Sequence, residues 1–240
     1  MSNKRNLMRI TSILFVSALF FLSSIPSSFA SEKVESKITK EQEKELRNNF
    51  KDMGITAKTA NKLVEKVSNG ELLDSQKQTE ITKHKDELFI DPEHNEKYVQ
   101  FKDGSRIMVS LEKAGPVTTY DYATGSVKYG TCSSGTGYRN CNVTARYNDG
   151  IWNISFNAKV STVQGGYDSI TSISRPSVDA VLYSVVQKKF KIMRTKETSS
   201  AAALAEYTNQ FTHKTGLYTV TRTLSLYAKS DKIYARLNYY

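Results

Sequence analysis

The chain has 240 residues, a formal net charge of +10 and a hydrophobic fraction of 39%. This length suits one medium domain, or a small module followed by a domain of roughly 130 to 140 residues. Beyond the first thirty residues no stretch is apolar enough to cross a bilayer, so a membrane-spanning protein is not expected.

The first thirty residues have the order of a secretory signal peptide. Lys4, Arg5 and Arg9 precede an apolar run at 10–22, and the small-residue site Ser28-Phe29-Ala30 follows. This order predicts a signal peptide over residues 1–30, with cleavage after Ala30. The alternative is a retained membrane anchor, but the apolar core is shorter than the roughly 20 residues that a spanning helix needs. No cysteine lies near the cleavage site, so a lipoprotein anchor is not expected.

Charge is unevenly distributed along the rest of the chain. Cleavage removes three positive charges and leaves a net charge of +7. Residues 31–97 carry 13 basic and 15 acidic side chains, whereas residues 98–240 carry 18 basic and 9 acidic side chains, a net charge of +9. The sequence therefore predicts a helical hairpin module at 31–75, a polar linker at 76–97 and an antiparallel β domain at 98–240. Any attraction to polyanions is expected in the β domain.

Two amphipathic helices are predicted in the first module. Thr39 is an expected N-cap with Gln42 at the capping-box distance, and the helix is expected to end at Gly54. A second helix is expected from Thr56 to the Asn69-Gly70 pair. The apolar stripe of the first helix consists of Leu46, Phe50 and Met53. The stripe of the second helix consists of Ala60, Leu63, Val64 and Val67. Such a pair is too short to be stable unless the stripes pack on something else.

The remaining chain predicts a β-rich fold. After the linker, with a frayed helix around 79–88, apolar and polar residues alternate strictly from Trp152 to Val160, which indicates a strand with one dry and one wet face. This strand should lie at the centre of the core. The other expected strands are 98–101, 105–111, 117–122, 126–129, 141–147, 167–174, 178–195, 201–212, 217–227 and 232–239. This number of antiparallel strands predicts a mainly β fold, a sandwich or barrel preceded by a small helical hairpin.

The only two cysteines are Cys132 and Cys141. In an exported chain this pair predicts a disulfide, and closing a ten-residue loop should contribute roughly 2.5 to 3 kcal/mol. The spacing fits neither a Cys-x-x-Cys redox motif nor a zinc site. The loop inside the bridge is rich in Gly and Ser, so it is either a recognition surface or a plain stapled turn.

The titratable residues give no catalytic pattern. His84, His94 and His213 have no partner at metal-ligand spacing, so we expect solvated surface histidines, no metal and no cofactor. No nucleophile-elbow motif is present. Asp103, Asp149 and Asp168 stand in or beside predicted turns, and turn chemistry is their simplest role.

One strand-like stretch is strongly basic. It contains Lys188, Lys189, Lys191, Arg194 and Lys196. Simple alternation places Lys189 and Lys191 on one face with Met193, and Lys188 and Arg194 on the other with Phe190 and Ile192. One reading is an edge strand that lysines guard against aggregation. The other is a binding site for an anionic wall polymer, a lipid headgroup or nucleic acid, although no motif for specific nucleic-acid recognition accompanies it.

All fourteen tyrosines lie at or after Tyr98. Tyrosine packs well in antiparallel sheets while its hydroxyl stays wet. The alternative is an aromatic patch for sugars or bilayer interfaces, made of Tyr218, Tyr227, Tyr234, Tyr239 and Tyr240.

Several short segments resemble uncharacterised secreted proteins of Gram-positive bacteria. They are Asn69-Gly70-Glu71-Leu72-Leu73-Asp74-Ser75, Lys102-Asp103-Gly104-Ser105, the cysteine pair around its Gly-Ser loop, and Gly166-Tyr167-Asp168. The resemblance covers most of the mature chain, but Leu73 stands where those proteins have tryptophan. It implies export and a bacterial source, and it assigns no catalytic or binding residue.

These observations predict a secreted, non-enzymatic binding protein, loosely associated with the cell wall through an anionic polymer or membrane surface. One alternative is a secreted toxin or bacteriocin-like protein that acts on membranes. The other is an unrecognised hydrolase, which a deep polar pocket with perturbed carboxylates or a buried His213 would favour.

Overall fold

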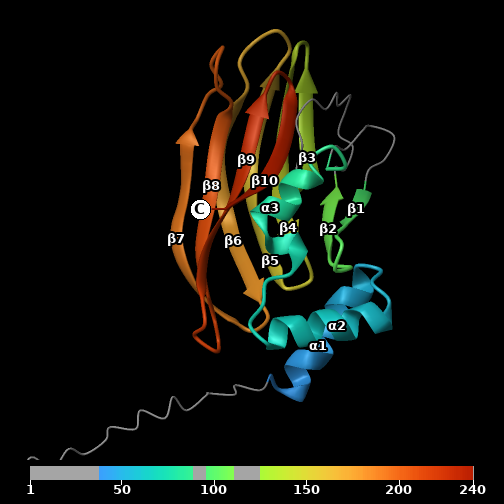
Figure 1. The fold of residues 1–240 in the computed structure, drawn as a ribbon. Coiled ribbons are helices and arrows are strands. Elements are labelled where there is room, and N and C mark those ends of the chain that lie inside the picture. Colours follow the sequence, from blue (N-terminus) through green and yellow to red (C-terminus); the bar gives the residue numbers. More distant parts are fainter. Residues whose placement is uncertain (1–37, 89–95, 111–124, 240) are drawn as a thin grey trace, which may run out of the picture. The chain divides into compact units, whose positions relative to one another are not determined.

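The computed structural model describes residues 38–88, 96–110 and 125–239, which belong to one compact unit. It is mainly β, with a small helical region that precedes two larger antiparallel sheets, as the sequence predicts (Figure 1). The expected strand at 117–122, His94 and Tyr240 lie outside the described residues, as does the predicted signal peptide.

The helical region consists of α1 (Lys40–Asp52), α2 (Ala57–Ser68), a short 3₁₀ turn η1 (Asp74–Gln76) and α3 (Gln78–Lys83). The predicted capping box is confirmed: the Gln42 amide donates to the Thr39 hydroxyl at 3.2 Å, and the Thr39 amide donates to the Gln42 side chain at 2.9 Å. The apolar stripes of both helices are buried. The frayed helix expected at 79–88 corresponds to α3, and Ile81 and Leu88 are buried.

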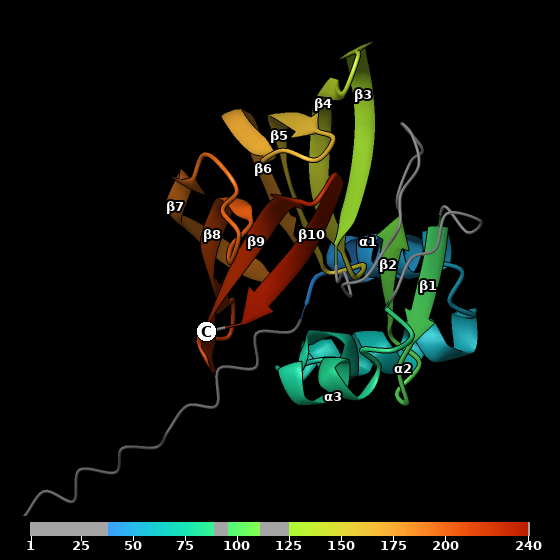
Figure 2. The same cartoon turned by 90° about the horizontal axis from the view of Figure 1, so that it is seen from above.

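Within the described residues, ten strands form three antiparallel sheets (Figures 1 and 2). The small sheet pairs β1 (Glu96–Gln100) with β2 (Arg106–Ser110). The second has the order β3-β4-β5-β6, with β3 (Ser126–Gly135), β4 (Tyr138–Asn148), β5 (Trp152–Val163) and β6 (Ser169–Ala180). The third has the order β10-β9-β8-β7, with β7 (Tyr183–Arg194), β8 (Ala203–His213), β9 (Thr219–Lys229) and β10 (Lys232–Tyr239).

The two four-stranded sheets pack face to face around the alternating strand that the sequence places at the centre. Trp152, Ile154 and Phe156 of β5 are fully buried. The Trp152 ring stacks on Phe211 of β8, with ring centroids 5.0 Å apart. The apolar side of β5 therefore faces the opposite sheet, and its polar side faces outward.

The sandwich is joined differently along its two sides. On one side a backbone bridge pairs Gly125 with Ala235 and so connects β3 to β10. A Cβ atom at residue 125 would lie 2.9 Å from the carbonyl oxygen of Arg146, which explains the glycine at this close approach. On the other side β6 and β7 follow each other through residues 181–182, and a bridge pairs Ser169 with Lys196.

The helical region packs against the β4–β5 turn. The side-chain amide of Asn49 donates a hydrogen bond to the Gly150 carbonyl at 3.0 Å. Gly150 has φ +85°, and a Cβ atom there would lie 2.8 Å from the Phe50 ring. Arg222 of β9 donates to the Gln76 carbonyl at 3.3 Å, so η1 contacts a strand of the other sheet as well.

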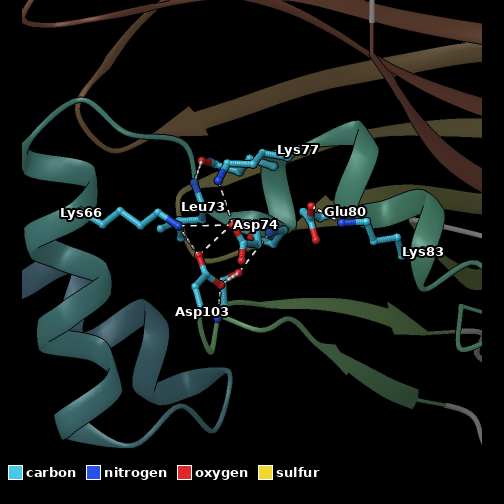
Figure 3. Close-up of polar contacts among 10 residues, drawn as sticks. Lys66, Leu73, Asp74, Lys77, Glu80, Lys83 and Asp103 are labelled. Atoms are coloured by element: carbon cyan, nitrogen blue, oxygen red, sulfur yellow. Dashed lines mark hydrogen bonds and ion pairs between the residues drawn. The ribbon is translucent and has the colours of Figure 1, made fainter.

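An ion-pair network joins α2, η1 and the β1–β2 turn (Figure 3). Asp103 accepts from the Lys66 ammonium at 2.7 Å and from the Asp74 amide at 2.9 Å. It also accepts from the Ser105 hydroxyl at 2.6 Å. Burial opposes the shift, but these hydrogen bonds hold the pKa of Asp103 below its usual value. The predicted turn role of Asp103 is confirmed, and the residue also joins three elements.

Candidate anion-binding face

The outer face of the β7–β10 sheet brings basic and aromatic side chains onto one surface. The register places them in three rows that cross all four strands. From β7 to β10, the first row holds Arg194, Leu204, Tyr227 and Tyr234, the second Lys191, Glu206, Ser225 and Arg236, and the third Lys189, Thr208, Thr223 and Asn238. We call these twelve residues the basic face.

Two β-bulges in β7 decide which of its side chains reach this face. The register shifts between Gln187 and Lys189, and again between Ile192 and Arg194. Each shift inserts one extra residue, which changes the phase of the alternation. The predicted grouping of Arg194 with Phe190 and Ile192 is therefore wrong. Phe190 and Ile192 pack against the core, whereas Arg194 lies on the outer face with Lys189 and Lys191.

The three β7 cations differ in their contacts. The Lys189 ammonium lies 3.0 Å from a carboxylate oxygen of Glu206. The Arg194 guanidinium donates to the Ala202 carbonyl at 2.7 Å. The Lys191 ammonium makes no ion pair or hydrogen bond within the described ranges. Glu206 is the one carboxylate of the basic face, so the face as a whole is positively charged.

The other two predicted basic residues lie elsewhere. Lys188 is the extra residue of the first bulge, at the edge of the sheet. Lys196 lies beyond the end of β7, and its ammonium is 6.0 Å from the centre of the Tyr167 ring, a cation–π contact. The structure thus brings three of the five predicted residues onto one face.

An aromatic stack occupies the opposite edge of the basic face. The rings of Tyr227 and Tyr234 are parallel within 9°, with centroids 4.9 Å apart. The Arg236 guanidinium lies 5.8 Å from the first ring centre and 5.4 Å from the second. Burial, and then the neighbouring Tyr227, raise the pKa of Tyr234 to about 12, so its hydroxyl stays protonated at neutral pH.

Sequence reasoning identified the two tyrosines and missed Arg236. The signal for it was available, because the short turn between the strands expected at 217–227 and 232–239 fixes the hairpin register. Counting outward from that turn pairs Tyr227 with Tyr234 and Ser225 with Arg236. Tyr218, the third tyrosine expected in this patch, lies elsewhere: its ring stacks on His213 and its hydroxyl contacts that of Tyr183.

Small polar side chains form the floor between the two edges. The hydroxyls of Thr208 and Thr223 are 2.8 Å apart, and the Asn238 amide donates to the Ser225 hydroxyl at 2.8 Å. Thr208, Thr223 and Ser225 are buried although they lie on an outer face. Their register neighbours Lys189, Glu206 and Arg236 have longer side chains.

The edge-strand reading also fits the structure. Both β7 bulges lie on an edge strand of the sheet, and the adjacent edge strand β6 carries Pro176 beside Arg175, which has φ +52°. Bulges, prolines and lysines all hinder pairing with another chain. Protection of the edge accounts for Lys188, but it does not account for the turning of Arg194 onto the outer face.

His213 is buried, with 2% of its surface exposed, so the expectation of a solvated surface histidine is wrong. It is the last residue of β8, and its ring packs against Tyr183 and Tyr218. Burial lowers its pKa, which keeps the ring neutral at pH 7. A buried His213 is the condition that would favour a hydrolase, but a ring with this little exposed surface, packed on Tyr183 and Tyr218, is not placed to reach a substrate. His84, the other described histidine, is partly exposed and lies 2.7 Å from Glu87.

Asp149 is a carboxylate with a strongly raised pKa. Burial raises its pKa to about 6, against the opposing hydrogen bonds of the Trp152 and Ile151 amides. It sits in the β4–β5 turn, as predicted, and none of its surface is exposed. A general acid or base must reach its substrate. The closed surroundings of Asp149 therefore give it a structural role.

The predicted disulfide between Cys132 and Cys141 is confirmed. The two residues are directly opposite each other in the β3–β4 pair, with Cα atoms 4.1 Å apart. Within the described part of the chain, no helix is long and apolar enough to cross a membrane. In the same residues, no group of three or more His, Cys, Asp or Glu side chains is arranged to hold a metal ion.

Comparisons with known proteins add little. No family model and no curated protein matches the chain. Among solved structures, it is similar to the crystal structure of a hypothetical protein from Listeria monocytogenes EGD-e, with 22% sequence identity and a TM-score of 0.33. The match covers 60% of this chain and 98% of that protein. A similarity at this TM-score carries no argument about function.

Proposed function

We propose that this protein is a secreted, non-enzymatic binding protein that attaches to an anionic polymer of the cell envelope through the basic face. The observation that carries the proposal is the pair of β7 bulges, which place Lys189, Lys191 and Arg194 on one side of the strand. A regular strand would turn Arg194 toward the core.

The spacing of these cations suits a polymer with repeated charges. Along a strand, side chains on one face recur about every 7 Å, so the three β7 cations form a line rather than a cluster. Across the sheet, Lys191 and Arg236 are separated by three strand spacings, about 14 Å. A single small anion cannot contact all of them, whereas a chain of anionic groups can follow the line.

The chemistry of the face supports attachment rather than a reaction. Exposed charge pairs are individually weak, so binding here depends on several simultaneous contacts. The stack of Tyr227 and Tyr234 adds a flat apolar surface at one edge, beside Arg236. This combination of basic and aromatic side chains on one face is suited to binding an anionic polymer.

Sedimentation with purified Gram-positive cell walls tests the proposal. We expect binding in 50 mM NaCl, loss of binding in 500 mM NaCl, and strong weakening in the variant K189Q/K191Q/R194Q. The control K51Q/K58Q/K62Q removes the same charge from exposed positions on the helical region and should bind like the parent protein. Thermal unfolding of both variants checks that they fold.

Two results would overturn this assignment. The first is an absence of wall binding in 50 mM NaCl, and the second is equal weakening by the two triple variants. Vesicles that contain phosphatidylglycerol distinguish the membrane alternative. Dye release from such vesicles, without wall binding, would favour the membrane-active alternative over attachment to the wall.

A further inference from the structure

The outer face of the β3–β6 sheet has a different chemistry from the basic face. Along β4 and β5 the outward side chains are mostly uncharged amides and hydroxyls. They include Asn140, Asn142, Thr144, Asn153, Ser155, Asn157 and Ser161. A surface of this kind offers many hydrogen-bond donors and acceptors on a rigid support.

Part of this face is hollowed beside the disulfide. The hollow has a volume of about 440 Å³, and its floor includes the buried residues Cys141 and Val160. The polar residues that line it are Thr131, Ser133, Asn140, Asn142, Lys159, Ser161 and Thr171. We call these nine residues the polar hollow.

Two β-bulges flank the polar hollow. Thr131 lies in the irregular segment of β3 between Tyr129 and Cys132, and Thr171 is the extra residue of β6 opposite the step from Lys159 to Val160. Bulges occur often beside binding sites, because they redirect a side chain and bend the strand. Here they lie on opposite sides of Asn142 and Lys159, with the disulfide bracing one of them.

Tyr138 extends the polar hollow with an aromatic ring. It shares the outer face of β4 with Asn140 and Asn142, because residues two apart point the same way. It is 48% exposed, and its ring lies so close to Gly135 that a Cβ atom at that position would collide with it. The missing side chain at Gly135 therefore lets the ring lie against the hairpin while about half of the Tyr138 surface stays exposed.

The polar groups of the hollow have unused hydrogen-bonding capacity. Within residues 38–88, 96–110 and 125–239, the side chains of Asn140, Asn142 and Ser161 make no hydrogen bond. Lys159 is the one charged residue of the polar hollow, and its ammonium has no ion pair in the same ranges. A ligand with several hydroxyl groups and one acidic group would complement this set.

We propose that Tyr138 and the polar hollow bind an acidic oligosaccharide. A sugar ring has an apolar face, which packs on the exposed side of Tyr138, and hydroxyls that pair with the amides of Asn140 and Asn142. Its carboxylate or phosphate lies at Lys159. From Tyr138 to Asn142 the strand rises about 14 Å, more than one sugar ring covers, so the ligand is a chain of sugars.

Calorimetric titration with defined oligosaccharides tests this site separately from the basic face. The titrations use the variant K189Q/K191Q/R194Q, which lacks the β7 cations and so removes the first site from the measurement. The probes are octasaccharides of hyaluronan and of polygalacturonate, with maltooctaose as the neutral comparison. Binding of an acidic probe here would stand even if the basic face bound no wall polymer.

Substitutions distinguish specific binding at the polar hollow from nonspecific binding elsewhere on the surface. Tyr138→Ala should weaken binding of the acidic probe about tenfold, and Asn142→Ala should also weaken it. The control Tyr167→Ala removes an equally exposed tyrosine, at 49%, from the neighbouring β5–β6 turn and should leave the affinity unchanged. Lys159→Gln should abolish the preference for acidic over neutral probes.

Three results would overturn the proposal. They are an absence of binding to both acidic octasaccharides, equal weakening by Tyr138→Ala and Tyr167→Ala, and equal affinity of the parent site for maltooctaose. The third would specifically contradict the role given to Lys159.

Discussion

The Tyr147 hydroxyl donates a hydrogen bond to the Asp149 carboxylate, 3.2 Å away, at the junction between the sandwich and the helical region. The other carboxylate oxygen accepts from the amides of Ile151 and Trp152 at 2.9 and 2.8 Å. Even with these three donors, complete burial raises the pKa of Asp149 from 3.8 to about 6. The stability of the junction should therefore depend on pH.

The first prediction concerns the sign of this dependence. An acid with a higher pKa in the folded state holds its proton more tightly when folded, so its stabilising contribution is complete below about pH 3.8 and is lost as pH rises through about 6. The loss should be about 3 kcal/mol in the free energy of unfolding. Asp149→Asn should remove this fall of the unfolding free energy between pH 4.5 and 7, as measured by urea unfolding at a series of pH values.

Asp168 provides an independent comparison, because burial raises its pKa to about 6 as well. It lies in the β5–β6 turn and accepts from the amides of Val163 and Asp231. Asp168→Asn should remove a second, separate part of the dependence of the unfolding free energy on pH. An unchanged pH slope in both variants would contradict the raised pKa values.

The second prediction compares two ion pairs of Figure 3. Asp103→Ala should cost about 2 to 3 kcal/mol, because it leaves the half-buried Lys66 ammonium and the Asp74 amide without their acceptor. Lys83→Ala removes an exposed pair with Glu80 and should cost less than about 0.5 kcal/mol. Thermal or urea unfolding at pH 7 measures both, and equal costs would contradict the structural role of Asp103.

The third prediction concerns the disulfide. The variant C132S/C141S should lose about 2.5 to 3 kcal/mol of stability, because the unfolded chain regains the freedom of a ten-residue loop. Reduction of the parent protein should lower the free energy of unfolding by the same amount, which lowers the denaturant midpoint. A much smaller loss would mean that the β3–β4 pairing already restricts the unfolded chain.

The fourth prediction uses two glycines with similar backbone conformations. Gly150 has φ +85° and Gly165 has φ +68°, but only Gly150 has a neighbour within reach of a new Cβ atom, the Phe50 ring at 2.8 Å. Gly165→Ala should cost about 1 kcal/mol, from backbone strain alone. Gly150→Ala should cost clearly more, because it also disturbs the packing of α1. Equal losses of unfolding free energy in the two variants would show that Phe50 and α1 shift to accommodate the new methyl group.

Features that depend on near neighbours in the chain could be predicted from the sequence. The capping box of α1 needs only Thr39 and Gln42. The central position of β5 follows from its own alternation, because one side of the strand is apolar and the other polar. The disulfide followed from the two cysteines together with the predicted signal peptide.

Features that depend on distant partners were wrong or missed. The outward position of Arg194 results from how β7 pairs with β8, and the sequence of β7 alone does not reveal a bulge. The burial of His213 depends on Tyr183 and Tyr218, which come from two other parts of the sheet. The pKa of Asp149 depends in turn on the chain segments packed around it.

The bridge between Gly125 and Ala235 has a consequence for how the sandwich fluctuates. It ties the β3–β10 side through one backbone hydrogen bond, from the Gly125 amide to the Ala235 carbonyl at 3.2 Å. On the β6–β7 side, the Ile170 amide donates to the Thr195 carbonyl and the Glu197 amide to the Asp168 carbonyl, each at 2.8 Å. Residues 181–182 also connect β6 directly to β7, so transient separation of the sheets is expected to begin between β3 and β10 and to proceed toward β6 and β7. The Gly125 amide is expected to exchange its hydrogen sooner than the amides of Ile170 and Glu197. The strand with the line of cations is thus expected to keep its contact with the facing sheet the longest.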